Sequence, residues 1–168
     1  MKHSLARILV VALGLTASML PGASAEAKET LTRAERKAQA AVWQTLQNVE
    51  VALQSGASAE KLVEMLYAEN IVITEEPPVV NLRGTKQAIE GVQAFLDYLG
   101  PGGGKGCKYR LVEPYVASAT TFSSYLALNC SANPPTMKEN LDLRLLYVWK
   151  KLPQGWRVVL ETVQTGMF

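Results

Sequence analysis

The chain has 168 residues, of which 48% are hydrophobic and 19% are charged, and its formal net charge is +2 at pH 7. This length suits one domain, and this composition can build a core, so a chain that is disordered throughout is excluded. The charge also argues against a general nucleic-acid-binding role, because such proteins present a strongly basic surface. Composition alone does not say what the protein does.

The N-terminal segment has the three parts of a secretory signal peptide. A short basic start precedes an apolar run over residues 8–20, and Ala-Ser-Ala at residues 23–25 supplies a small-x-small cleavage site. A transmembrane helix needs about 20 apolar residues, so this run is too short for a comfortable span. An uncleaved anchor is the alternative. We expect cleavage after Ala25, a secreted or periplasmic mature chain that starts at Glu26, and no membrane span after cleavage.

Removal of that segment would leave 15 basic and 15 acidic residues and would take away His3, the only histidine. A mature chain without histidine cannot hold a histidine metal site, a Ser-His-Asp triad or a Cys-His dyad. The spacing of Cys107 and Cys130 fits no zinc motif. We therefore expect no metal site and no cofactor.

Helical patterns come first along the mature chain. Residues 26–37 are polar and mixed in charge, which predicts a frayed lead-in. Apolar residues at 4-3-4 spacing predict a helix over residues 38–54, because that spacing makes one helical face. Ser58 is placed to cap a second, shorter helix, and Thr85 to cap a third over residues 86–99.

Strand patterns dominate the second half. A short β-branched run at residues 71–73 precedes the third helix, and a flexible glycine-rich loop is expected at residues 100–104. Two hairpins are predicted after that loop, with strands over residues 108–116, 121–130, 141–150 and 156–164. Early helices and late strands predict an α+β fold, with helices packed on one face of an antiparallel sheet. Such a sheet, when curved and closed by helices, encloses space that commonly binds ligands.

The first hairpin makes a geometric prediction about the two cysteines. A four-residue turn would place Val116 opposite Thr121, and the same register puts Cys107 directly opposite Cys130. Facing Cβ atoms in an antiparallel pair are about 4.5–5.5 Å apart, near the spacing of about 3.5–4.5 Å in disulfides. In an oxidising compartment we expect one disulfide between them. Two buried free thiols are the alternative.

Three segments occur in an order that is informative. Residues 66–77 begin with Leu-Tyr-Ala-Glu-Asn and continue into the predicted short strand and a loop. Residues 83–89, Arg-Gly-Thr-Lys-Gln-Ala-Ile, contain the start of the third predicted helix. The final predicted hairpin includes residues 147–159. This order resembles the nuclear-transport-factor-2-like superfamily, in its ketosteroid-isomerase and SnoaL-like branch, across roughly residues 40–166. The resemblance implies a cone-shaped fold, with three N-terminal helices packed on a curved antiparallel sheet, a pocket inside and dimerisation through the sheet.

The resemblance also implies where catalytic groups would lie. Counting from Leu66 to Gly84 without gaps places Glu75 at the position of the isomerases' general base. The tyrosine and aspartate of their oxyanion hole would fall near Val49 and Leu145, whose side chains cannot donate a hydrogen bond. Ketosteroid isomerase activity is therefore not expected. Glu75 stays a candidate base, with a solvated loop carboxylate as the alternative.

The same comparison suggests a pocket wall. The strand face that carries Leu143, Leu145 and Tyr147 would look into the cone, with plain sheet core as the alternative. Val49 and Tyr67 complete the predicted lining.

We expect the chain to divide into a signal peptide over residues 1–25, a lead-in over residues 26–37 and a nuclear-transport-factor-2-like domain over residues 38–168. Three hypotheses about its function stay open. The leading hypothesis is a secreted or periplasmic homodimer that binds a small, mostly apolar molecule without catalysing a reaction. The second is an isomerase, dehydratase or cyclase-like enzyme with Glu75 as general base. The third is a protein-interaction adaptor that works through an exposed sheet face.

Overall fold

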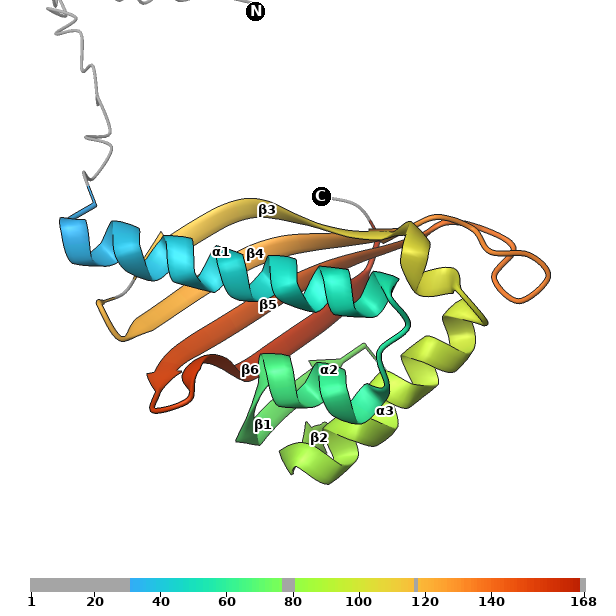
Figure 1. Ribbon diagram of the computed structural model, residues 1–168, viewed down its shortest axis with the longest axis horizontal. Coiled ribbons are helices and arrows are strands. Elements are labelled where there is room, and N and C mark those ends of the chain that lie inside the picture. Colours follow the sequence, from blue (N-terminus) through green and yellow to red (C-terminus); the bar gives the residue numbers. More distant parts are fainter. Residues whose placement is uncertain (1–30, 77–80, 117, 167–168) are drawn as a thin grey trace, which may run out of the picture. The chain divides into compact units, whose positions relative to one another are not determined.

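The computed structural model describes residues 31–76, 81–116 and 118–166, so the predicted signal peptide lies outside the described residues. Residues from Leu31 onward form one compact unit in which helices cover a face of a six-stranded sheet (Figure 1). Its elements are α1 (Arg33–Gln54), α2 (Ala59–Leu66), β1 (Tyr67–Glu75), β2 (Leu82–Arg83), α3 (Gly84–Leu99), the 3₁₀ helix η1 (Gly103–Gly106), β3 (Cys107–Val116), β4 (Thr121–Cys130), β5 (Leu141–Leu152) and β6 (Gly155–Thr165). The predicted α+β class is confirmed.

The first helix begins earlier than expected, at Arg33, inside the segment predicted to be a frayed lead-in. Thr32 and Glu35 form a capping box: the Thr32 hydroxyl accepts from the Glu35 amide at 3.2 Å, and the Glu35 carboxylate accepts from the Thr32 amide at 2.6 Å. Ser58 caps α2 as predicted, accepting from the Lys61 amide. The apolar stripe of α1 is buried against the sheet.

The start of α3 differs from the prediction. The helix begins at Gly84 with Arg83 in the N-cap position, and no side chain caps it. The hydroxyl of Thr85 instead donates to the backbone carbonyl of Glu69 at 3.3 Å. The Thr85 hydroxyl, which the local sequence pattern predicted to cap α3, therefore makes a tertiary contact with β1 instead.

The glycine-rich segment after α3 is not loop throughout, because residues 103–106 form η1. A Cβ added at Gly104 would stand 2.5 Å from the backbone carbonyl oxygen of Leu53, so only glycine permits this approach to the end of α1. Gln54 fixes the same junction by donating from its side-chain amide to the Cys107 carbonyl at 2.9 Å.

The sheet is mixed, which corrects the predicted antiparallel sheet. Its strand order is β2-β1-β6-β5-β4-β3, and every neighbouring pair is antiparallel except β1 and β6, which run parallel. The predicted strand at residues 71–73 is the middle of the longer β1, which gains its length by pairing with β6. Sequence pattern could not reveal this pairing, because the two strands are far apart along the chain.

The disulfide predicted from the first hairpin is present. Cys107 and Cys130 lie opposite each other on β3 and β4, with an S–S distance of 2.04 Å and a Cα–Cα distance of 3.9 Å. The bond joins the start of the edge strand β3 to the end of β4.

The register at the other end of this hairpin is not the predicted one. Val116 pairs with Phe122 rather than with Thr121. The register shifts by one residue between Leu111 and Glu113, so a β-bulge compensates for the different turn before the strands reach the cysteines. The cysteine pairing was therefore correct, although the turn on which it rested was not.

The core lies between the helices and the sheet, and its largest members come from β5. Tyr147 and Trp149 are fully buried and pack edge to face, with ring centroids 5.6 Å apart. The indole N–H of Trp149 donates to the buried hydroxyl of Ser124 at 3.1 Å, which satisfies the only polar atom of that side chain. Among the described residues, no helix has the length and apolar character needed to cross a membrane.

Candidate ligand pocket

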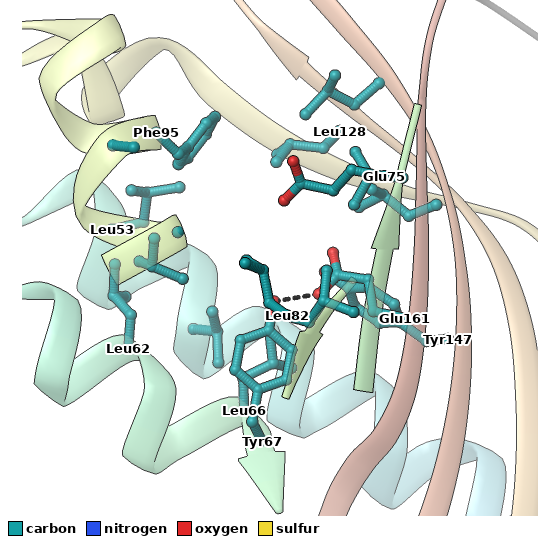
Figure 2. A pocket seen from close by; sticks show the side chains of 18 of the residues that line it. Leu53, Leu62, Leu66, Tyr67, Glu75, Leu82, Phe95, Leu128, Tyr147 and Glu161 are labelled. Atoms are coloured by element: carbon teal, nitrogen blue, oxygen red, sulfur yellow. Dashed lines mark hydrogen bonds between the residues drawn. The ribbon is translucent and has the colours of Figure 1, made fainter. Parts of the chain in front are cut away.

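A cavity with a volume of about 290 Å³ lies between the three helices and the sheet. The helices contribute apolar side chains, among them Leu53, Leu62 and Phe95, together with Tyr98, and the sheet contributes the other polar ones (Figure 2). Its volume is at the lower end of the range of about 300–1,000 Å³ that small-molecule sites occupy. The cavity suits a small ligand with a largely apolar body.

The structure brings together every pocket and catalytic residue that the sequence singled out. The residues that line this one cavity include Val49, Tyr67, Glu75, Leu143, Leu145 and Tyr147. Leu143, Leu145 and Tyr147 alternate along β5 without a break, and each contributes to the wall. Their placement is a finding, whereas a ligand-binding or catalytic role for them stays a prediction.

Sequence analysis missed Glu161, the most buried carboxylate of the cavity, which is only 5% exposed. Alternation from Trp156 and Val158 would point the next odd-numbered side chains out of the core. The register between β5 and β6 shifts at Val159, because Trp149 pairs with Val158 and Val148 pairs with Leu160. This bulge turns Glu161 inward. The one available signal was that Glu161 is the lone acid of β6.

Glu161 is held among tyrosine side chains. It lies opposite Tyr147 on β5 and opposite Ile73 on β1, and its Oε2 accepts a hydrogen bond from the Tyr67 hydroxyl (Figure 2). Burial raises the pKa of Glu161 to about 7, and the nearby charge of Glu75 acts in the same direction, while hydrogen bonds from Tyr67 and Tyr147 oppose it. This carboxyl therefore changes charge near neutral pH.

Three tyrosines keep their protons around this carboxyl. Burial and the charge of Glu161 raise the pKa values of Tyr67, Tyr109 and Tyr147 above the ordinary value for a phenol. Tyr109 and Tyr147 also act on each other's pKa, so the group extends from β1 across β5 to β3. The backbone amide of Tyr109 also donates to the Glu50 carboxylate at 2.7 Å, which ties β3 to α1. The cavity thus has one polar end of neutral phenols and one acid.

Glu75 is the second carboxylate of the cavity. It lies at the end of β1 opposite Val163, is partly buried, and has its pKa raised by burial. Figure 2 shows its carboxylate pointing from the sheet into the space in front of Phe95. It is therefore not a fully solvated loop carboxylate.

Positive charge is missing from this wall. Among the described residues, those that line the cavity include no lysine, arginine or histidine. No group of three or more metal-ligating side chains occurs within the same described part of the chain. The chemistry that these residues offer is hydrogen bonding by phenols and a carboxyl group, proton exchange near neutral pH, and contact with an apolar body.

No protein-family profile and no curated protein matches the chain. Solved structures do match it. A ketosteroid isomerase-like protein from Erwinia carotovora atroseptica superposes with a TM-score of 0.57 at 15% identity, over 77% of this chain and 96% of that one. An NTF-2-like protein of unknown function from Shewanella oneidensis gives 0.59 at 12% identity, over 74% and 97%. An uncharacterised Caulobacter vibrioides protein with a cystatin-like fold gives 0.58 at 16% identity, over 78% and 91%.

The architecture and the cavity define an α+β protein with an internal pocket between helices and a mixed sheet. At these low identities the solved structures show a shared fold alone: the chain folds like NTF-2-like and ketosteroid isomerase-like proteins. Because this fold carries many unrelated activities, function must be argued from the cavity itself.

Proposed function

We propose that the protein binds a small, mostly apolar molecule in the cavity between its helices and its sheet. The observation that carries this proposal is the distribution of side chains on the wall, which is apolar on the helical side apart from Tyr98 and has its carboxyls and its other phenols on the sheet side. A few convergent polar groups in an apolar cavity are typical of ligand sites, because the polar groups orient what the apolar wall holds. We take the space to narrow as in a cone, with the tyrosines and Glu161 at one end.

We also propose that the protein works outside the cytosol, after cleavage behind Ala25. The disulfide between Cys107 and Cys130 supports an oxidising compartment, since such bonds are rare in the reducing cytosol. An exported chain would have an intact mass that corresponds to a start at Glu26.

A larger side chain that fills the cavity should prevent the ligand from binding. Val92 lies on α3 and lines the cavity, whereas Val51 lies on α1, is 61% exposed and does not line it. We expect the exported wild-type protein and Val51→Phe to retain a bound small molecule in native mass spectrometry, and Val92→Phe to lose it, because the larger ring occupies the space. Equal retention by the two variants would place the ligand elsewhere, and a bare wild-type protein would contradict the proposal. The same spectra show whether the protein is a homodimer.

A proton-transfer enzyme of the isomerase, dehydratase or cyclase kind is the second candidate, and the buried Glu161 favours it. A general base works best when its pKa is near the working pH, and the pKa of Glu161 is about 7. Glu75 is the alternative base on the same wall. Val49 and Leu145 cannot stabilise an oxyanion, and the Tyr67 hydroxyl already donates to Glu161, so a substrate oxygen would have to take over that hydrogen bond.

Exchange at carbon tests this second candidate. Protein that retains its small molecule is transferred to deuterium oxide, and the mass of the recovered molecule is measured by mass spectrometry. An enzyme of this kind should introduce deuterium at a carbon position, and Glu161→Gln should slow that exchange by a factor of about 100 or more, the usual contribution of a general base. No exchange in the wild-type protein would leave binding as the function.

A further inference from the structure

The cavity has an uneven charge. Glu161 and Glu75 both line it, while no basic side chain of the described residues does. Glu161 is 5% exposed and Tyr147 1%, so the polar end is shielded from water. In such surroundings charges interact more strongly than in water, because the local dielectric constant is lower. The wall therefore discriminates between ligands by charge as well as by shape.

We propose that the ligand of this cavity is a lipophilic amine, an apolar molecule whose protonated amino group binds at Glu161 among Tyr67, Tyr109 and Tyr147. This inference rests on the proposed binding function and adds the class of ligand. A carboxylate can accept a charge-assisted hydrogen bond from an ammonium group, and tyrosine rings attract a cation through their faces. The apolar wall from the helices would hold the rest of the molecule.

Other classes of ligand fit this wall less well. A fatty acid or another carboxylate would bring a second or third negative charge beside Glu161 and Glu75, with no basic group to compensate. A neutral alcohol could hydrogen-bond to the same oxygens but would gain nothing from their charge. A protonated amine is the one of the three that both carboxylates favour.

This assignment couples binding to pH. A bound ammonium group favours the ionised form of Glu161, so binding at mildly acidic pH expels the proton that burial keeps on the free protein. The titratable groups that line the cavity with Glu161 are Tyr67 and Glu75 of β1, Tyr109 of β3, Tyr147 of β5 and Tyr98 of α3. Phenols stay protonated over this range, so the carboxyl groups alone set the pH dependence.

The test uses three probes of one size: phenylbutylamine, phenylbutanol and phenylbutyrate. Titration calorimetry on the wild-type protein at pH 8 should give the amine at least about tenfold tighter binding than the alcohol, with the acid weakest. Glu161→Gln should remove about tenfold of the amine affinity and leave the alcohol unchanged. Glu90→Gln, on the exposed side of α3 and away from the cavity, is the matched control and should change neither.

The pH series supplies a second measurement that needs no variant. The amine affinity should fall about fivefold from pH 8 to pH 6, as the fraction of ionised Glu161 falls and the weaker binding of the protonated form remains, while the alcohol affinity stays constant. Below pH 7, calorimetry in buffers of different ionisation enthalpy should show protons released when the amine binds.

The outcomes separate the two proposals. An alcohol that binds as tightly as the amine, with no effect of pH, would overturn the amine inference and leave apolar binding in place. Failure of all three probes to bind would overturn both. If Glu161→Gln does not fold, Glu75→Gln replaces it as the test variant. A loss of amine affinity smaller than about tenfold, with the alcohol affinity unchanged and the pH series as expected, would support the inference. An unchanged amine affinity with no effect of pH would overturn it.

Discussion

Replacing Glu161 by glutamine should make the protein more stable than the wild type by about 3 kcal/mol at pH 8, and the two should be equally stable near pH 4. The pKa of this carboxyl is about 7 in the folded protein, against 4.5 for an ordinary glutamic acid. Between these values the folded state keeps its proton and the unfolded state loses it. Wild-type stability is therefore complete below about pH 4.5 and is lost as the pH rises through about 7. Glutamine has no charge to desolvate and can still accept from Tyr67.

Urea unfolding of the two proteins at several pH values between 4 and 8 measures this difference. The two proteins share all their other carboxyl groups, and of these Glu75 is the one whose charge acts on Glu161. Glu90→Gln is the control, since that side chain is exposed. A difference between Glu161→Gln and wild type that is the same at every pH would contradict the buried, uncompensated carboxyl.

Removing the disulfide should lower the free energy of unfolding by about 3.5 kcal/mol, because the loop it closes then regains its freedom in the unfolded chain. Cys107 and Cys130 are 23 positions apart, and this separation sets the expected size of the effect. The double variant Cys107→Ala, Cys130→Ala leaves no thiol behind, and its unfolding by urea is compared with that of the oxidised wild type.

A reducing agent supplies the matched control for the disulfide. It should lower the stability of the wild type toward that of the double variant and should leave the double variant unchanged. Because β3 is an edge strand that pairs only with β4, amide protons of β3 should also exchange faster once the bond is gone. Equal stability of the oxidised wild type and the double variant would contradict this prediction.

Local patterns predicted the elements that depend on neighbours in sequence. The stripe of α1, the Ser58 cap of α2 and the two hairpins are of this kind. The Cys107–Cys130 pairing also followed from a local register. What failed depended on distant contacts: Thr85 bonds to β1 instead of capping α3, and the parallel pairing of β1 with β6 has no local signal.

The pocket shows the same limit at the level of single residues. Leu143, Leu145 and Tyr147 could be predicted to share a face because β5 alternates without interruption between them. The inward position of Glu161 could not be predicted, because the bulge at Val159 reverses the alternation on β6 and no neighbouring residue type indicates a bulge. Strict period-two counting thus found the apolar part of the wall and missed its acid.

The parallel pairing of β1 with β6 also sets the order in which this site can form. Tyr67 and Glu161 are 94 positions apart, and their hydrogen bond exists only once the first long strand of the sheet has met the last. In a chain whose hairpins have formed but whose β6 has not yet met β1, Glu161 still lies in water and ionises as an ordinary acid. Desolvation of this acid therefore requires the long-range pairing of β6 with β1, so the polar end of the cavity exists only in the completed sheet.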